Sequence, residues 1–423
     1  MKLSQFFIRW GLRSFMAVYA VLMSIAKWIG SRKQELKREN YVILLTGTFY
    51  SDNWIMSHVQ PLAISQRTSV VYMVASSPLP PMKKVKAIYP PSWLTNLIGK
   101  VPARLLTFFW TGVRIRPDFV GGFHILANGL VAALLGRMIG ARSIYFCGGG
   151  PREVIGGGYL GNRVFGKLKT EDKFIERQLL KAVSAFDVVI GMGNNTIDFF
   201  KSNGIKTNYY VVSGGKDENV FYPSLTTADY DLILVARLTE VKRVDIFLKA
   251  VKIVSQSIPD VSAIIVGDGP LRSALEALSN ELGLGSKVRF VGHQTEVGNW
   301  LRKAKICVLT SESEGLSLAL IEAMMCGLPA IVSKVGDIDE LVEDSINGFL
   351  VSDLTPEGFA SRFIELMTNN ELMTQFSEAA LKSTEKYKLS NASCLWDDIL
   401  SNNTEIRINE SVIITQEKSV IEK

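Results

Sequence analysis

Two carboxylates, Glu314 and Glu322, lie eight residues apart where a polar loop runs into an apolar helix. Gly315 follows the first carboxylate and allows the chain to turn and a ligand to approach the backbone closely. The helix is predicted to run from 318 to 325, with Ser317 as its N-cap. The first N–H groups of such a helix have no partner within it and form a site for phosphate. Carboxylates beside a phosphate site indicate a ligand with both hydroxyls and phosphates, and a nucleotide sugar is such a ligand.

The surrounding sequence makes this pattern more specific. The run EGLSLALIEAMMCGLPAIVSKVGDIDELVEDSINGFLV, from 314 to 351, resembles the E-x7-E signature of the retaining GT-B glycosyltransferases called glycosyltransferase family 4. Upstream, VARLTEVKRVDIFLKAV (235 to 251) is similar to the phosphate-binding strand and helix of that family, with Arg237 and Lys242 in the matching places. VGDGPLR and FVGHQTEVGNWLRKAKICVLTSESEG follow in the family's order. The resemblance implies the fold and the reaction class but not the identity of the sugar.

The chemistry that the resemblance implies needs both cations and carboxylates. Breaking the bond between an anomeric carbon and a nucleoside diphosphate leaves negative charge on the departing oxygen, so fixed cations there stabilise the transition state. Arg237 and Lys242 match this role. The resemblance also implies that Glu322 accepts hydrogen bonds from ribose hydroxyls and that Glu314 faces the transferred sugar. It favours a retaining front-face reaction in which the departing phosphate takes the acceptor proton, and it leaves the detailed route open.

Three further features belong to the expected first domain. His124 ends the run RPDFVGGFH, where the family commonly has a strand that ends in His near the donor sugar and the acceptor. A catalytic His124 is therefore expected, with a hydrogen-bonded loop histidine as the alternative. Only Gly47 remains of the paired glycines that many relatives carry after the first strand. Residues 147 to 158 contain six glycines around Arg152 and Glu153, and we predict a mobile acceptor-side loop there.

The predicted site combines these motifs. The catalytic residues are Glu314, Arg237, Lys242 and His124. The donor-binding residues are Glu322, Gly315, Leu316, Ser317, Leu318, Gly267, His293 and Gly47. Arg152 and Glu153 are assigned to the acceptor side.

Motifs for cofactors and metals are incomplete. Gly267 and Gly269 are spaced as in a dinucleotide fingerprint, but its third glycine and its ribose-binding acid are missing. Asp337 and Asp339 have the D-x-D spacing of a manganese site, but they follow Gly336 where a helix is predicted to open. The four cysteines are widely spaced, which argues against a zinc cluster and favours a reducing compartment. We therefore expect no metal and no cofactor, with the nucleotide sugar as a substrate.

The net positive charge of the chain comes from its first 40 residues. Residues 1 to 40 hold eight basic and two acidic side chains, a balance of 8 − 2 = +6 that equals the net charge of the whole chain. The other 383 residues are balanced, at 39 against 39. The body of the protein therefore lacks the basic field that nucleic acid requires, whereas its N-terminus suits anionic lipid.

Three interpretations of the first 30 residues remain open. A basic start and a 13-residue apolar run fit a cleaved secretory signal or a spanning helix shorter than the usual ~20 residues. In a helix, four basic residues would share one stripe within about 40°, flanked by two tryptophans. They are Lys2, Arg9, Arg13 and Lys27, with Trp10 and Trp28 beside them. We prefer an in-plane anchor at the cytoplasmic face of the cell membrane, with the basic stripe toward the headgroups.

The stretch from 90 to 110 also mixes apolar, aromatic and basic side chains. This composition predicts a second membrane-docking face. A buried core helix with a solvated edge is the alternative.

Alternating strands and helices define the expected fold. Strands are predicted at 41–45, 69–75, 142–147, 186–191 and 209–212, and then at 231–237, 261–267, 287–292, 305–310, 329–333 and 348–351. This pattern predicts an α/β protein with two doubly wound, Rossmann-like parallel sheets that face a central cleft, the GT-B arrangement. The predicted parts are a membrane-associated segment (1–40), an acceptor-side domain (41–213), a nucleotide-sugar domain (214–385), a helix that crosses back (386–400) and a mobile tail (401–423).

These features together predict a hexosyltransferase of the retaining type. It would move a sugar from a nucleoside-diphosphate sugar to a lipid-linked or glycan acceptor in cell-surface polysaccharide synthesis. A GT-B sugar-nucleotide epimerase and a non-catalytic membrane-bound nucleotide-sugar-binding scaffold are the alternatives.

Overall fold

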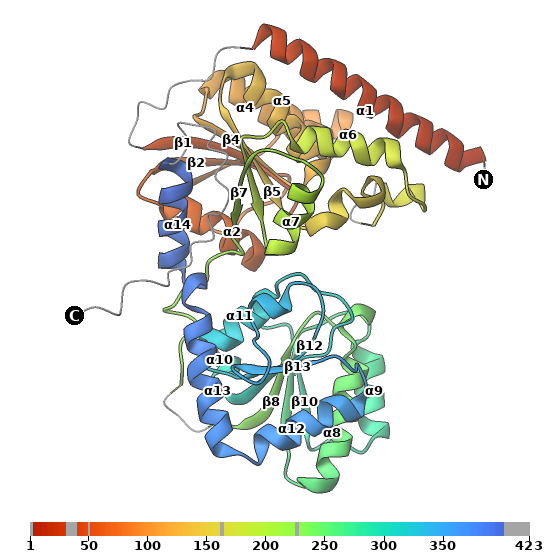
Figure 1. The fold of residues 1–423 in the computed structure, drawn as a ribbon, viewed down its shortest axis with the longest axis vertical. Helices are drawn as coiled ribbons and strands as arrows, with labels where there is room; N and C mark the ends of the chain where they lie inside the picture. The colour runs from red at the N-terminus through yellow and green to blue at the C-terminus, as the bar shows by residue number, and fades with distance from the viewer. Residues whose placement is uncertain (1–2, 31–39, 50, 161–164, 225–227, 402–423) are drawn as a thin grey trace.

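The computed structural model of the chain describes residues 3–30, 40–49, 51–160, 165–224 and 228–401. These residues form two domains, each built on a parallel sheet with helices on both of its faces (Figure 1). The predicted pair of doubly wound sheets is confirmed. The predicted tail falls, beyond Ser401, outside the described residues.

The first domain contains a seven-stranded sheet in the order β3-β2-β1-β4-β5-β6-β7, with all neighbouring strands parallel. The strands are β1 (Tyr41–Thr46), β2 (Thr68–Val74), β3 (Val85–Ile88), β4 (Phe119–Phe123), β5 (Arg142–Cys147), β6 (Val188–Gly191) and β7 (Asn208–Val211). The helices are α1 (Leu3–Ile29), α2 (Asp52–Ile64), α3 (Ser92–Ile98), α4 (Lys100–Ile115), α5 (Leu130–Ile139), α6 (Lys173–Val183), α7 (Asn194–Ser202) and α14 (Leu389–Ser401). One core cluster lies on each face of this sheet.

The second domain contains a six-stranded parallel sheet in the order β10-β9-β8-β11-β12-β13. The strands are β8 (Tyr230–Val235), β9 (Ala263–Val266), β10 (Val288–Gly292), β11 (Ala304–Leu309), β12 (Ala330–Ser333) and β13 (Gly348–Val351). The helices are α8 (Val244–Ser257), α9 (Arg272–Glu281), α10 (Val297–Leu301), α11 (Leu318–Met325), α12 (Pro356–Met367) and α13 (Asn370–Ser383). Again, one core cluster covers each face.

The order of each sheet predicts where a ligand binds. The chain reverses its direction of growth between β1 and β4 in the first sheet and between β8 and β11 in the second. In sheets of this kind ligands bind beyond the carboxyl ends of the strands at such switch points. The loops after β1, β4, β8 and β11 are therefore the segments that should build a site.

Strand β4 departs from the usual composition of a buried strand. All five of its residues are buried, although two of them are glycines that disfavour a strand interior. A Cβ at Gly121 would lie 2.6 Å from Cδ2 of Leu45 in β1, and a Cβ at Gly122 would lie 2.5 Å from the carbonyl of Asn128. The two glycines therefore let β1 and the turn after β4 approach the strand closely.

The chain crosses between the domains twice, and the two crossings lie side by side. The N–H of Lys216 donates to the carbonyl of Tyr387 at 2.8 Å, and the N–H of Leu389 donates to the carbonyl of Lys216 at 2.8 Å. After the second crossing α14 packs against α2, and its Trp396 and Ile399 join the core of the first domain. Figure 1 shows α14 against the first domain, although it follows the second in sequence.

Helix α1 lies across the outside of α5 and α6 (Figure 1). Its Met16 and Tyr19 are buried in the core of the first domain. The predicted orientation, with the basic stripe toward lipid headgroups, is wrong for two of its members. Arg9 and Arg13 form ion pairs with Asp172 at 3.5 and 3.0 Å because this carboxylate is buried and requires a cation.

The stretch from 90 to 110 combines its two predicted roles. In α4, Phe108 is buried, and the buried Arg104 donates to Asn128 at 2.8 Å. On the other side, Trp93 of α3 and Trp110 of α4 are 67% and 71% exposed. This stretch thus packs into the core on one side and exposes aromatic side chains on the other. Docking of the exposed side to a membrane stays a prediction.

Candidate active site

The loops after β8 and β11 bring Lys242 and Glu314 together. Lys242 Nζ donates to Glu314 Oε1, which also accepts a hydrogen bond from Ser311 Oγ at 2.5 Å. Thr310 Oγ1 donates to the carbonyl oxygens of Lys242 and Arg243, at 3.0 Å each. Because β8 and β11 are neighbours in the sheet, their loops meet at one edge. A cation and a carboxylate 72 residues apart in sequence thus become one half-buried pair.

The remaining residues of this edge are more open. Arg237 is exposed just after β8, and its guanidinium makes no hydrogen bond to another side chain among the described residues. A Cβ at Gly315 would meet no atom within 4 Å, so the backbone there is open to a ligand. Ser317 is the N-cap of α11 as predicted, but its side chain makes no capping hydrogen bond. Leu316 and Leu318 pack against the core below.

Glu322 lies deeper, in a closed triangle of polar side chains. Its Oε1 is 2.5 Å from Nζ of Lys216 and accepts a hydrogen bond from Nδ2 of Asn53 at 2.7 Å. Lys216 Nζ also donates to Asn53 Oδ1 at 2.7 Å. The three residues come from α11, the first crossing segment and α2, so the triangle joins both domains at their hinge. Contact of Glu322 with a ribose stays a prediction.

The ion pair within the triangle is almost sealed from solvent, whereas Asn53 lies at an exposed position. The side chains of Lys216 and Glu322 are 3% and 2% exposed. Burial lowers the pKa of Lys216 more than the charge and hydrogen bond of Glu322 raise it. Lys216 and Asn53 were not predicted, because no spacing in the sequence links either residue to Glu322.

His124 follows β4 in an unusual backbone conformation. Its φ of +64° is rare for a residue with a side chain, and such strain is often found at functional sites. The imidazole is stacked on Trp54, with ring centroids 6.1 Å apart, and Trp54 is stacked on His58 at 4.2 Å. A Cβ at Gly148 would lie 3.2 Å from the imidazole and 3.0 Å from the indole. The glycine therefore leaves room for the histidine and the tryptophan side by side.

Glu153 anchors His124 and is not exposed to an acceptor. Its Oε1 accepts hydrogen bonds from His124 Nδ1 at 2.8 Å and from Gly149 N at 2.6 Å. Its Oε2 accepts from Ile125 N at 2.7 Å and from the Tyr145 hydroxyl at 2.8 Å. This placement differs from the predicted acceptor-side position, because the carboxylate turns inward from the glycine-rich loop. Its satisfied oxygens fix the ring of His124.

The electrostatics of this pair favour an imidazolium and a carboxylate. Burial lowers the pKa of His124, but the charge and the hydrogen bond of Glu153 outweigh it and raise this pKa above its ordinary value. Burial raises the pKa of Glu153, but the charge of His124 and the hydrogen bonds to the carboxylate lower it below its ordinary value. Each group therefore favours its charged form more than it would without its partner.

This pair predicts a pH-dependent stability. The raised pKa of His124 gives stabilisation that is complete below its unfolded value of 6.5 and is lost as the pH rises through the folded value. We therefore expect the stability difference between the wild type and His124→Gln to shrink as the pH rises from 6 to 9. Urea unfolding of both proteins across this range measures it, with His293→Gln as the exposed control. A difference that does not change with pH would contradict the pairing.

Other predicted residues are placed apart from these clusters. Arg152 is exposed, so the structure separates it from its buried neighbour Glu153. Gly47 follows β1 and is covered by the ring of Phe49, which would lie 2.5 Å from a Cβ at that position. Gly267 has a φ of +143° and packs against Ala236, whose carbonyl oxygen would lie 1.9 Å from a Cβ. His293 is exposed directly after β10. A donor contact by Gly47, Gly267 or His293 and an acceptor contact by Arg152 stay predictions.

A second contact joins the domains at the rim of the cleft. Glu340 Oε1 accepts a hydrogen bond from Asn194 N at 2.5 Å, and Asp337 accepts one from Asn195 Nδ2. Asp337 is the N-cap of the short helix Ile338–Glu340, as its place after Gly336 predicted, but its carboxylate makes no capping hydrogen bond and contacts α7 of the other domain. Burial raises the pKa of both Asp337 and Glu340 above its ordinary value. The second domain therefore presents two carboxylates to the N-terminal end of α7.

Comparison with known families decides the class of the second domain. Residues 216–383 match the family model of glycosyl transferases group 1. The second domain is therefore a glycosyltransferase domain, and it contains both Lys242 and Glu314.

Curated relatives match a larger part of the chain. The chain is 29% identical, over 227 residues, to the N-acetyl-alpha-D-glucosaminyl L-malate synthase of Bacillus anthracis, covering 50% of this chain and 58% of that protein. The poly(glycerol-phosphate) alpha-glucosyltransferase of Bacillus subtilis (strain 168) is 24% identical over 268 residues, covering 60% and 38%. The chain spans about half the length of the curated relatives it matches.

Solved structures show the same fold over most of the chain. Anabaena HepE in complex with UDP-glucose aligns with a TM-score of 0.65 at 18% identity, covering 86% of this chain and 100% of that one. The sucrose-phosphate synthase of Thermosynechococcus elongatus aligns with a TM-score of 0.67 at 16% identity, covering 85% and 98%. The predicted GT-B fold, which consists of two Rossmann-like domains, is thereby confirmed.

Proposed function

We propose that this protein transfers a sugar from a nucleoside-diphosphate sugar to a lipid-linked or glycan acceptor, with retention of the anomeric configuration. The observation that carries the proposal is the pairing of Lys242 with Glu314 at the switch point of a glycosyltransferase domain. Two similar structures are described as complexes with UDP or UDP-glucose, which supports a nucleotide-sugar donor. The names of the relatives support hexose or N-acetylhexosamine as the class of sugar.

The residues of the cleft have distinct roles in this proposal. Lys242 and Arg237 stabilise the negative charge that develops on the departing diphosphate. The open backbone at Gly315 and the start of α11 accept the phosphates, because there is free space at Gly315 and the first N–H groups of a helix have no partner within it. Glu314 orients the hydroxyls of the transferred sugar. No metal is required, because the fixed cations take the role that a divalent cation has in other glycosyltransferases.

His124 acts from the opposite domain. Its Nδ1 is held by Glu153, so its Nε2 is the nitrogen left to contact a substrate. A protonated imidazole in this position donates a hydrogen bond to a sugar hydroxyl or a phosphate oxygen. His124 therefore links the acceptor-side domain to the donor, and the stacked Trp54 gives the sugar an apolar neighbour.

A panel of UDP-, GDP- and TDP-sugars tests the proposal. We expect one donor to raise the melting temperature of the protein, since a ligand that binds the folded state stabilises it. The same donor should release its nucleoside diphosphate slowly in water and faster with an acceptor. Nuclear magnetic resonance of the product should show the anomeric configuration of the donor. Excess EDTA should leave the rate unchanged, and rescue by manganese of an EDTA-inhibited enzyme would contradict the metal-free chemistry.

The same experiment separates the alternatives. A sugar-nucleotide epimerase would convert the donor sugar without transfer to an acceptor. A scaffold would bind the donor and show the thermal shift, but it would release no nucleoside diphosphate with any acceptor. Either outcome would refute glycosyl transfer.

A further inference from the structure

Helix α1 has an inward and an outward face of different character. The inward face packs on the first domain through Met16, Tyr19 and Ala26. The outward face consists of large apolar side chains that are exposed to solvent. They are Phe6, Phe7, Trp10, Phe15, Val18, Val21, Leu22, Ile25 and Trp28. This outward face is unusual for a soluble monomer, where exposed apolar residues are mostly scattered singly.

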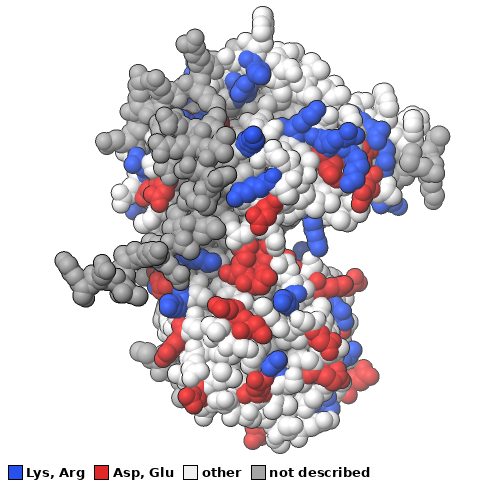
Figure 2. All heavy atoms as spheres, in the orientation of Figure 1, with Lys and Arg blue, Asp and Glu red and all other residues white. Residues whose placement is uncertain are grey.

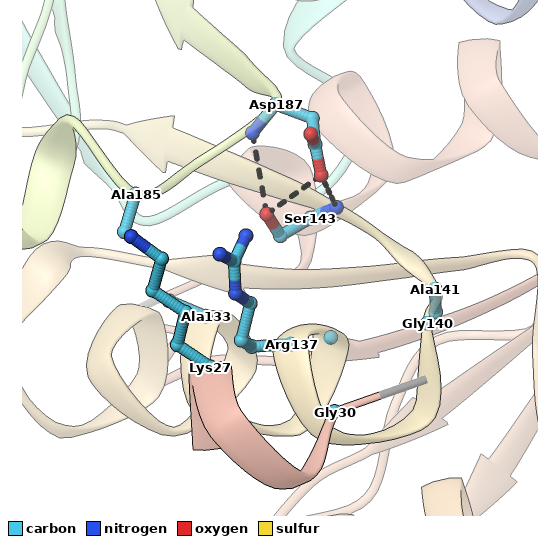
Figure 3. Close-up of a pocket in the computed structure, with 10 residues that line it drawn as sticks. Lys27, Gly30, Ala133, Arg137, Gly140, Ala141, Ser143, Ala185 and Asp187 are labelled. Carbon is cyan, nitrogen blue, oxygen red and sulfur yellow. Dashed lines mark hydrogen bonds between the residues drawn. The ribbon is translucent and has the colours of Figure 1, made fainter. Parts of the chain in front are cut away.

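The charged side chains of α1 are all basic. Two of them, Arg9 and Arg13, pair with Asp172 of the first domain, and the third is Lys27. At its C-terminal end, Lys27 and Arg137 extend toward a polar pocket of about 210 Å³ that also contains Ser143 and Asp187 (Figure 3). Figure 2 shows that Lys and Arg side chains gather over the first domain, whereas Asp and Glu gather over the second. This charge pattern complements an anionic lipid surface.

The length and the ends of α1 also fit a membrane surface. Its 27 residues extend for about 40 Å at ~1.5 Å per residue. Trp10 and Trp28 are 64% and 88% exposed near the two ends of the outward face. Tryptophan concentrates at the boundary between headgroups and acyl chains because its ring is apolar and its N–H is polar.

We propose that the outward face of α1 lies in the plane of an anionic lipid bilayer while the inward face stays on the first domain. The side chains of the outward face enter the boundary between headgroups and acyl chains. Lys27 and Arg137 contact lipid phosphates at one end of the helix. This inference does not depend on the proposed sugar transfer.

The packing of α1 opposes a spanning orientation. The helix is long and apolar enough to cross a membrane by length and composition. To cross it, however, α1 would have to leave the first domain and expose Met16 and Tyr19. Asp172 would then lose both arginines and keep only the N–H groups of Phe174 and Ile175 as partners, and loss of the cationic partners of a buried carboxylate is costly. The contacts of the inward face therefore hold the helix parallel to the domain surface.

Vesicle flotation of the full-length protein tests this proposal. The triple variant Trp10→Glu, Val18→Glu and Ile25→Glu should lose at least tenfold of its binding to vesicles of phosphatidylcholine and phosphatidylglycerol. The double variant Lys27→Gln and Arg137→Gln should bind these vesicles more weakly than the wild type does. Wild-type binding should fall with added salt and with vesicles of phosphatidylcholine alone.

Two controls separate binding from misfolding. Ile346→Glu adds a charge to an apolar residue that is 51% exposed in the second domain, and it should float like the wild type. Melting curves of all variants should match the wild type, because the substituted side chains point outward. Wild-type flotation by the triple variant would overturn the proposal. The proposal would also be overturned if the wild type did not bind vesicles and formed a dimer that the triple variant does not form. The outward face of α1 would then bind a second copy of the chain.

A depth measurement distinguishes the in-plane from the spanning helix. In a Cys394→Ser background, which removes the exposed cysteine, Val18→Cys carries an environment-sensitive fluorophore. In the in-plane orientation, quenchers near the headgroups should reduce its emission more than quenchers at the bilayer centre. The opposite order would overturn the in-plane orientation.

Discussion

Lys242→Ala should lower the turnover of sugar transfer by at least about 100-fold, as removal of a preorganised oxyanion donor does. The loss should be in kcat more than in donor KM, because the charge on the departing phosphate is greatest in the transition state. Arg237→Ala should have an effect of similar size without unfolding the protein, because Arg237 is exposed. Steady-state kinetics with the identified donor measures both variants.

A neighbouring cation provides the control for these variants. Lys249→Ala removes a half-exposed lysine of α8 that lies 4.0 Å from Asp245, and its turnover should stay near the wild-type value. Melting temperatures should show that both test variants are folded. Wild-type turnover in both Arg237→Ala and Lys242→Ala would refute the assignment of the site.

Lys216→Met should destabilise the protein by about 3–5 kcal/mol, the cost of removing one partner from a buried ion pair. The reason is that Glu322 would keep its charge in a nearly sealed site with only Asn53 as its partner. A double variant, Lys216→Met with Glu322→Met, should recover most of this stability, because an apolar pair replaces the ionic one. The shift of the urea unfolding midpoint at constant m-value measures the effect.

The matched control is the same substitution in an exposed pair. Lys305 contacts Asp231 at 2.8 Å, with 51% of the lysine side chain exposed. Lys305→Met should therefore cost less than about 1 kcal/mol. If Lys216→Met were no more destabilising than this control, the ion pair between Lys216 and Glu322 would not stabilise the folded protein. The double variant should also bind the donor weakly, as expected if Glu322 contacts the donor.

The sequence carried more information on the fold than on the contacts. Continuous apolar runs predicted nearly all strands, because buried parallel strands require them. Strand β4 is the exception in pattern, since Gly121 and Gly122 weaken the apolar run, and only the family resemblance implied a strand before His124. The short β3 at Val85–Ile88 has no strong pattern because it is a partly exposed edge strand.

The site was predictable where a motif carries it. The loops that hold Lys242 and Glu314 were identified, because residue type and spacing are preserved in a local motif. The partners of Glu322 were not, because Asn53 and Lys216 reach it only after both domains fold. Glu153 was included in the predicted site, but the inward direction of its side chain was not predicted. A loop sequence does not specify which of its side chains face inward.

The orientation of α1 shows the same limit. Helical periodicity placed Arg9 and Arg13 on one stripe, but it could not indicate that Asp172, more than 150 residues away, would pair with them. The whole stripe was therefore predicted to contact lipid, although Arg9 and Arg13 pair with a carboxylate of the first domain.

The course of α14 makes the first domain discontinuous in sequence. Trp396, Ile399 and Leu400 are fully buried in a core whose other members all precede residue 213. A fragment that ends at the first crossing would thus expose the apolar surface that α14 covers, whereas residues 216–387 carry a complete sheet and both of its cores. The second domain is in effect an insertion within the first. Ribosomal synthesis must therefore finish the glycosyltransferase domain before the domain that started first can close.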